Sequence, residues 1–188
     1  MNLLKHTAIT LTFLSLTGCY GTSYMTEVIT TDEPNLYDQS HEVVDELISF
    51  AEKNSKFSGV SLNSDSPFII ASFVDVNQMD QSSAFGRIIS EQFASRFSQK
   101  GYYVVELKLR KDIFIKEKEG EFMLSRRIKE ITRNHNAQAI IVGTYAIGEN
   151  NVYITTRMID PPTNRIISSY DYRLPISEDI SKLLEVQY

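Results

Sequence analysis

The stretch FIIASFVDV, residues 68–76, decides the fold of this chain. It is a nearly continuous apolar run rich in β-branched residues, which is typical of a strand buried on both faces within a parallel sheet. The stretch AIIVGTY, residues 139–145, has the same character, whereas YYVVELKL, residues 102–109, partly alternates and should have one wetter face. These three segments are therefore predicted to be strands of one sheet.

Amphipathic helices are predicted before and between these strands. Ser82 or Ser83 is expected to cap the N-terminus of the second helix, and Gly101 is expected to end it. Because helical crossovers join successive strands, the three strands should run parallel to one another. The predicted helices, each with an apolar stripe at helical spacing, cover residues 36–54, 85–99 and 122–134.

The last part of the chain has a different pattern. Turn signals at 148–151 and 161–164 delimit two further strands, at 152–160 and 165–174, which should return as antiparallel hairpins. The fold class is therefore predicted to be α/β of the mixed α+β kind. We expect a mixed sheet of about five strands, three of them parallel, with helices packed on the sheet.

Three smaller features complete the predicted fold. Residues 110–121 should form a charged loop, with a short strand near 113–115. Gly143 lies inside a predicted strand, where glycine usually marks a bulge or a close backbone approach. The polar segment 177–184 has the pattern of a short helix.

The amino-terminal leader contains a bacterial lipobox. Lys5 supplies a positive n-region, and residues 7–17 form an apolar h-region that is too short to span a bilayer. LTGC follows at 16–19, where Cys19 provides the thiol that takes diacylglycerol as a thioether. Because Cys19 is the only cysteine, lipidation would leave no thiol for other chemistry. The alternatives are an ordinary signal peptide with a chance cysteine, or an uncleaved anchor.

The lipobox divides the chain into predicted parts. Several acyl chains on Cys19 would give stable membrane anchoring. Tyr20 follows the cysteine in place of the Asp that favours the inner membrane, so we expect an outer-membrane lipoprotein facing the periplasm. The parts are a signal peptide at 1–18, a lipidated flexible tether at 19–35, a folded domain at 36–176 and a C-terminal tail at 177–188.

Charge and residue types argue against several functions. The net charge of −5 becomes one unit more negative when Lys5 is removed with the leader, which disfavours a nucleic-acid surface. His41 and His135 are expected to be surface or capping residues, and zinc-ligand spacing is missing. We therefore expect no enzyme activity, no metal, no cofactor and no small-molecule substrate.

Two patterns near the first strand have a structural and a functional interpretation. Ser82 and Ser83 lie outside any G-x-S-x-G motif, so a helix cap is favoured over an activated serine. Asp75 and Asp80 follow the carboxyl end of the first buried strand, where open α/β sheets often bind ligands. A small-ligand or cation site there stays open as the alternative to a polar connector.

The last hairpin is the main candidate contact surface. Tyr and Arg are enriched at interface hot spots, and a sheet edge can pair with another chain. The basic helix at 122–134 is a second candidate, which the acidic segment 117–121 of another copy could meet. The candidate residues are Tyr153, Arg157, Tyr170, Tyr172 and Arg173 on the hairpin, and Arg126 and Arg127 on the helix.

From residue 68 to residue 174 the chain resembles the FlgO family of flagellar outer-membrane lipoproteins. The similarity is carried by FIIASFVDVNQMDQSSAFGRIISEQFASRFSQKGYYVVELKLRKDI, by GEFMLSRRIKEI and by AIIVGTY, together with the lipobox. Its most specific pieces are SFVD at 72–75, SAFGR at 83–87, EF with LSR within 121–126, and VGTY at 142–145.

The resemblance implies a non-catalytic protein needed for motility in polar-flagellated bacteria. Such a protein would surround the flagellar basal body at the outer membrane, with other flagellar lipoproteins and the basal-body outer rings as partners. The fold implied is similar to the amino-terminal domain of TolB. A homo-oligomeric ring is the hypothesis that fits this role, and it needs a heterologous interface.

Three other functions are alternatives to this one. The chain could be a binding module of another envelope machine, such as an activator of a peptidoglycan synthase or a secretion-system component. A secretion pore of the curli type would need added hairpins of about ten alternating residues, for which the chain has no spare segments. A periplasmic hydrolase would need nucleophile and base motifs that the sequence lacks.

Overall fold

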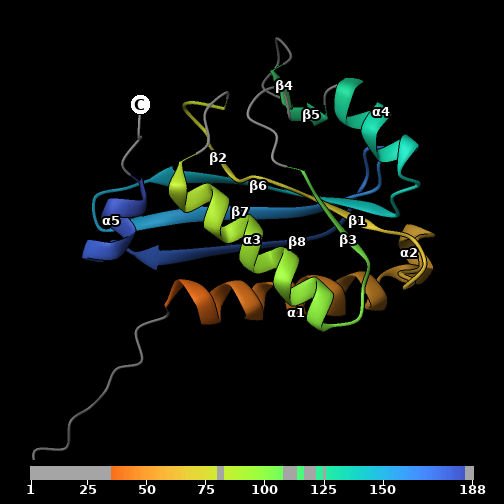
Figure 1. Cartoon of the computed structure of the whole chain (residues 1–188), viewed down its shortest axis with the longest axis horizontal. Helices are drawn as coiled ribbons and strands as arrows, with labels where there is room; N and C mark the ends of the chain where they lie inside the picture. Colours follow the sequence, from red (N-terminus) through yellow and green to blue (C-terminus); the bar gives the residue numbers. More distant parts are fainter. Residues whose placement is uncertain (1–34, 80–82, 108–113, 117–121, 125, 185–188) are drawn as a thin grey trace, which may run out of the picture. The chain divides into compact units, whose positions relative to one another are not determined.

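The computed structural model describes most of the predicted folded domain (Figure 1). Cys19, the tether up to residue 34 and the acidic segment 117–121 lie outside the described residues. Within them, no helix is long and apolar enough to cross a membrane. The described residues are 35–79, 83–107, 114–116, 122–124 and 126–184.

A six-stranded mixed sheet forms the centre of the domain. Its strands are β1 (Phe68–Ala71), β2 (Val74–Asp75), β3 (Val104–Leu107), β6 (Ala139–Ile147), β7 (Asn151–Ile159) and β8 (Ile166–Pro175). The order is β3-β1-β6-β7-β8, with β2 also paired to β6. β1 pairs in parallel with β3 and β6, whereas β6, β7 and β8 pair antiparallel, which confirms the predicted polarities.

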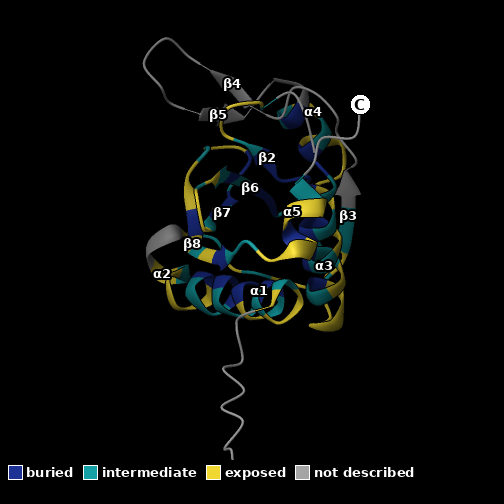
Figure 2. Ribbon diagram, turned by 90° about the vertical axis from the view of Figure 1, so that its left-hand side faces the viewer, coloured by how far each residue is buried: buried dark blue, intermediate teal, exposed yellow. Residues whose placement is uncertain are grey.

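Helices cover the two faces of this sheet unequally. The helices are α1 (Leu36–Lys53), α2 (Ser55–Ser58), α3 (Ala84–Gln99), α4 (Arg126–Asn134) and α5 (Glu178–Leu184). α1, α3 and α5 share one hydrophobic core with one face, whereas Ile128 of α4 packs on the other face. In Figure 2, α1, α3 and α5 gather below and to the right of the strands, and α4 lies near the top.

Burial on both faces explains why the opening stretch is apolar throughout. Phe68 and Ile70 of β1 face the core shared with α1 and α3. Ile69 and Ala71 face the smaller core beneath α4. All four side chains are fully buried, so β1 tolerates no polar alternation.

The first two long helices form where the sequence predicts them. Asn35 caps α1, because its Oδ1 accepts a hydrogen bond from the Asp38 amide at 2.9 Å. Ser83 caps α3 through a 3.0 Å bond to its Oγ from the Gly86 amide. Gly101, at φ +86°, follows the end of α3 as predicted.

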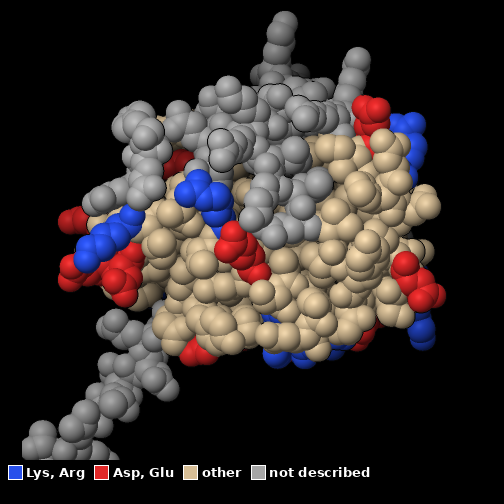
Figure 3. Space-filling model, viewed as in Figure 1, with Lys and Arg blue, Asp and Glu red and all other residues tan. Residues whose placement is uncertain are grey.

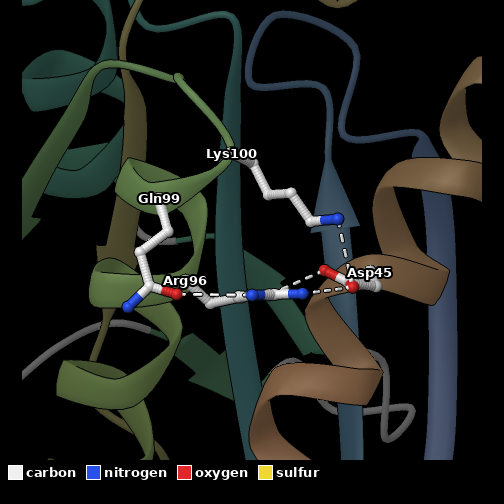
Figure 4. A network of polar contacts seen from close by, with 4 residues as sticks. All are labelled: Asp45, Arg96, Gln99 and Lys100. Carbon is white, nitrogen blue, oxygen red and sulfur yellow. Dashed lines mark hydrogen bonds and ion pairs between the residues drawn. The ribbon is translucent and has the colours of Figure 1, made fainter.

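An ion-pair cluster joins α1 to α3 (Figure 4). Arg96 donates to the Asp45 carboxylate from Nε at 2.9 Å and from Nη2 at 2.6 Å, and Lys100 Nζ lies 3.1 Å from the same carboxylate. The hydrogen bond from Arg96 lowers the pKa of Asp45, although partial burial acts in the opposite direction. The cluster therefore links α1 to α3 through charged side chains.

The predicted strand over 68–76 is interrupted. β1 ends at Ala71 and β2 begins at Val74, because the Phe73 amide leaves the ladder and donates to the Gly86 carbonyl oxygen at 3.2 Å. The main sheet therefore has six strands instead of about five. The predicted strand over 102–109 is described as the shorter β3.

The predicted helix over 122–134 is wrong in its first turn. Residues Phe122–Leu124 form a strand, β5, which pairs antiparallel with β4 (Phe114–Lys116), and α4 begins at Arg126. The short apolar run fits a period of two as well as one of 3.6, so cross-strand pairing decides its conformation. β4 agrees with the short strand expected near 113–115.

Candidate functional site

Phe73, in the segment 72–75, lies where this segment meets two others, 83–87 and 142–145. A Cβ at Gly86 would overlap the Phe73 carbonyl group, and a Cβ at Gly143 would overlap the Phe73 ring. Glycine is required at both positions because of close approach, independently of backbone strain. At Gly143 the close neighbour is thus an aromatic side chain, whereas a bulge or a close backbone approach was expected.

Tyr145 and Ser83 close the same cluster. The Tyr145 hydroxyl donates to Ser83 Oγ at 2.8 Å, and both groups are buried. Burial raises the pKa of Tyr145, which the hydrogen bond to Ser83 partly counteracts. Ser83 therefore accepts from Tyr145 as well as from the helix, which is a packing and capping role, as the helix-cap interpretation predicts.

The possible ligand site after β1 has a local structural explanation. Asp75 Oδ1 accepts a 2.7 Å hydrogen bond from the Asn77 amide and so closes a turn. Asp80 lies outside the described residues. Among the residues that the structure describes, no group of three or more His, Cys, Asp or Glu side chains is arranged to hold a metal ion.

The two predicted surface histidines lie apart from this cluster. The His41 ring centroid on α1 is 4.2 Å from the Tyr37 ring centroid, in a tilted arrangement. His135 is exposed directly after α4. His135 is therefore a surface residue as expected, whereas His41 is half-buried against Tyr37.

The hairpin of β7 and β8 has one accessible face. Strand pairing sets Tyr153 opposite Arg173, and Tyr153 is 53% exposed. Arg157 is half-buried in β7, and Arg173 is exposed. We name this surface the outer hairpin face, and it comprises Tyr153, Thr155, Arg157, Ser169, Asp171 and Arg173.

Tyr170 and Tyr172 lie on the opposite face of the same hairpin. The Tyr170 ring stacks on Phe50 of α1, with centroids 6.5 Å apart and an interplanar angle of 21°. The Tyr172 hydroxyl is buried beside Ser40 of α1, and this burial raises the pKa of Tyr172. These two tyrosines pack α1 onto β8 and are not part of the outer hairpin face.

The second predicted contact surface is described only in part. The side chains of Arg126 and Arg127 lie outside the description, although their backbone begins α4. Farther along α4, Lys129 and Arg133 line a cavity of about 510 Å³. The cavity also includes Pro161 and Pro162, which sequence reasoning assigned only to a turn. Only the topology of the sheet could have indicated this cavity, because it brings the end of α4 and the β7–β8 turn together at one end of β6.

Three of the four most specific pieces of the family resemblance, 72–75, 83–87 and 142–145, gather around Phe73, and the residues described above there are used for packing. A family model described as FlgO protein matches residues 41–179. The chain belongs to the FlgO family. Membership indicates a lipoprotein of the cell envelope that is associated with the flagellum. No curated protein matches the chain in sequence.

Solved structures of similar shape were found at low sequence identity. The LpoB C-terminal domain from Salmonella enterica is 12% identical, with 72% of this chain and 97% of that chain covered and a TM-score of 0.44. The same domain from Escherichia coli is 14% identical, with 73% and 99% covered and a TM-score of 0.42. A PelC dodecamer from Paraburkholderia phytofirmans is 13% identical, with 61% and 75% covered and a TM-score of 0.43. Likeness at this level carries no information about function.

Proposed function

We propose that this FlgO-family chain is a lipoprotein anchored to the outer membrane through Cys19, with its folded domain on the periplasmic face. It is a non-catalytic structural component that assembles as a ring around the flagellar basal body and is required for motility. Its partners are further copies of itself, other flagellar lipoproteins and the basal-body outer rings.

The observation that carries this proposal is the family match over residues 41–179, in a chain that has the lipobox LTGC at 16–19. The geometry supports a structural role, because the family-like segments around Phe73 hold the sheet and α3 together. The outer hairpin face supplies a contact surface, since Tyr153 and Arg173 are of the residue types found at interface hot spots.

A deletion strain of the source bacterium tests the proposal. The strain is expected to lose swimming in soft agar, and the wild-type chain supplied in trans should restore it. A Cys19→Ala chain should not restore swimming, because it lacks the acceptor thiol for the lipid. Fractionation should find the wild-type chain in the outer membrane and the Cys19→Ala chain elsewhere, while immunoblots check that both chains accumulate equally.

Normal swimming of the deletion strain would contradict the flagellar role. If swimming were normal and peptidoglycan synthesis were impaired, the alternative of a peptidoglycan synthase activator would replace it. If Cys19→Ala restored swimming from the outer membrane, the lipid-anchor part of the proposal would be wrong.

A further inference from the structure

The three long strands β6, β7 and β8 separate two ends of the domain that differ in charge. α4 and the β7–β8 turn lie at one end, and the β6–β7 turn and α5 lie at the other (Figure 1). Nine residues of β6, at about 3.3 Å each, set the two ends roughly 30 Å apart. The two surfaces therefore cannot contact each other within one copy.

The first end has a cavity with two cations. Lys129 and Arg133, one helical turn apart on α4, line the cavity of about 510 Å³ together with Ala137, Pro161 and Pro162. Glu130 on the same helix lines a neighbouring hollow with Lys129 and Arg133, so the described residues that line the two hollows carry two cations and one carboxylate. The cavity thus combines cationic sides with apolar proline and alanine surface.

The second end is acidic. Glu178 and Asp179 begin α5, and both are exposed. Glu149 is exposed in the β6–β7 turn, which lies beside the start of the α5 segment because the Ile176 amide donates to the Asn150 carbonyl oxygen at 3.0 Å. Figure 3 shows acidic side chains gathered at this left-hand end of the molecule.

One cation and one apolar side chain modify the acidic end. Lys182 pairs with Glu178 at 2.7 Å, which offsets one carboxylate and leaves an acidic excess. Ile147, at the end of β6, is 50% exposed. The end therefore presents carboxylates next to an apolar side chain, which matches the cations and prolines of the cavity.

We propose that the cavity between α4 and the β7–β8 turn receives the acidic end of a second copy, so that copies associate head to tail. This inference deepens the proposed function, because it names the self-contact of the ring. The contact is heterologous, since two different surfaces meet, and a heterologous contact closes into a ring when its rotation allows. A second copy is the occupant because this chain carries both complementary surfaces, and their separation leaves both accessible.

Engineered cysteines test the contact in the full lipidated protein in native membranes. An Arg133→Cys, Glu149→Cys double variant is oxidised and resolved on a non-reducing gel. The two positions lie at opposite ends, far beyond the about 7 Å between Cα atoms that a disulfide allows, so any bond between them is intermolecular. The expected result is a ladder of covalent oligomers.

The single variants Arg133→Cys and Glu149→Cys are the matched controls. Each single variant can give at most a dimer, because one thiol makes one bond. A ladder from the double variant alone supports the head-to-tail contact. Dimers of equal strength from a single variant would indicate a symmetric contact and would overturn the proposal, as would the absence of any crosslinked species.

Charge reversal supplies an independent test in detergent solution. A Lys129→Glu, Arg133→Glu variant and a Glu178→Lys, Asp179→Lys variant should each lose self-association in sedimentation. An equimolar mixture of the two should associate again, because the acidic cavity of one variant faces the basic end of the other. Recovery in the mixture also excludes misfolding as the cause of loss. A mixture that stays monomeric, or variants that associate like the parent, would contradict the contact.

Failure of the contact and failure of the proposed function give different results. If neither crosslinking nor sedimentation detects self-association while the deletion strain still cannot swim, the head-to-tail contact is wrong and the flagellar role is retained. If the ladder forms while the deletion strain swims normally, the contact is retained and the flagellar role is wrong.

Discussion

The ring of Phe73 occupies the space that a side chain at Gly143 would need. The Phe73 side chain is completely buried, and it lies between α3 and β6. Its ring also packs edge-on against Phe93 of α3, with centroids 5.1 Å apart. The contact between Phe73 and Gly143 thus packs the interruption between β1 and β2 against the neighbouring strand β6.

Gly143→Ala should destabilise the domain by about 1–3 kcal/mol, because the added methyl group overlaps the Phe73 ring in a packed core. Urea unfolding of the mature chain with Cys19→Ser measures the change. Thr144→Ala, at a half-buried neighbouring position, is the control and should cost less. In a Phe73→Ala background, which by itself should cost about 3–5 kcal/mol, the extra cost of Gly143→Ala should vanish. Additive costs would contradict the contact.

Asp45→Asn should lower the free energy of unfolding by about 0.5 kcal/mol at pH 7, a small value because the pair with Arg96 is partly exposed to solvent. The folded-state pKa of Asp45 is below its ordinary value of 3.8, so the unfolded state takes up the proton first as the pH falls. The contribution is therefore complete above about pH 4 and is lost below it. Urea unfolding at pH 7 and pH 3 should show the difference between parent and variant shrinking at the lower pH. A constant difference would contradict this.

Tyr172→Phe should make the domain less sensitive to alkali. Burial raises the folded-state pKa of Tyr172 above its ordinary value of 10.0, so the unfolded state loses the proton first as the pH rises. Stability from this group is complete below pH 10 and falls above it. Unfolding free energies measured from pH 8 to pH 11 should fall less steeply for Tyr172→Phe than for the parent. Parallel curves would show that the buried hydroxyl has no such effect.

Tyr153→Ala and Arg173→Ala should reduce swimming while leaving stability within about 0.5 kcal/mol of the parent, because both side chains lie on the outer hairpin face. Soft-agar swimming and urea unfolding measure the two quantities on the same variants. Ser169→Ala, on the same face, is the matched control and should swim normally. If Tyr153→Ala and Arg173→Ala swim normally, this face is not a contact surface.

Much of the fold follows from local sequence pattern. The apolar runs at 68–76 and 139–145 mark strands that helices cover on both sides, and the alternation over 152–158 marks a strand with one covered face. The caps at Ser83 and Gly101 follow from their own chemistry. By contrast, the start of α4 depends on pairing between β4 and β5, a contact between segments that no single stretch encodes.

The candidate contact surfaces could be predicted from the sequence less completely than the fold. Tyr153 and Tyr172 belong to the same hairpin, yet one is half-exposed and the other has its hydroxyl buried beneath α1. Strand alternation gives the two faces, but which face α1 covers depends on the tertiary fold. The cavity beside Lys129 likewise arises from two segments distant in sequence that strand topology brings to one end.

Asn35, the capping residue of α1, is also the point where the proposed membrane tether would join the folded domain. A force applied through that tether would act first on the first turn of α1. The Asn35 cap and the packing of Leu36 on the core are then the first contacts to bear mechanical load, before the ion pair at Asp45 and well before the sheet. Under tension, the domain would lose the start of α1 while its strands stayed paired.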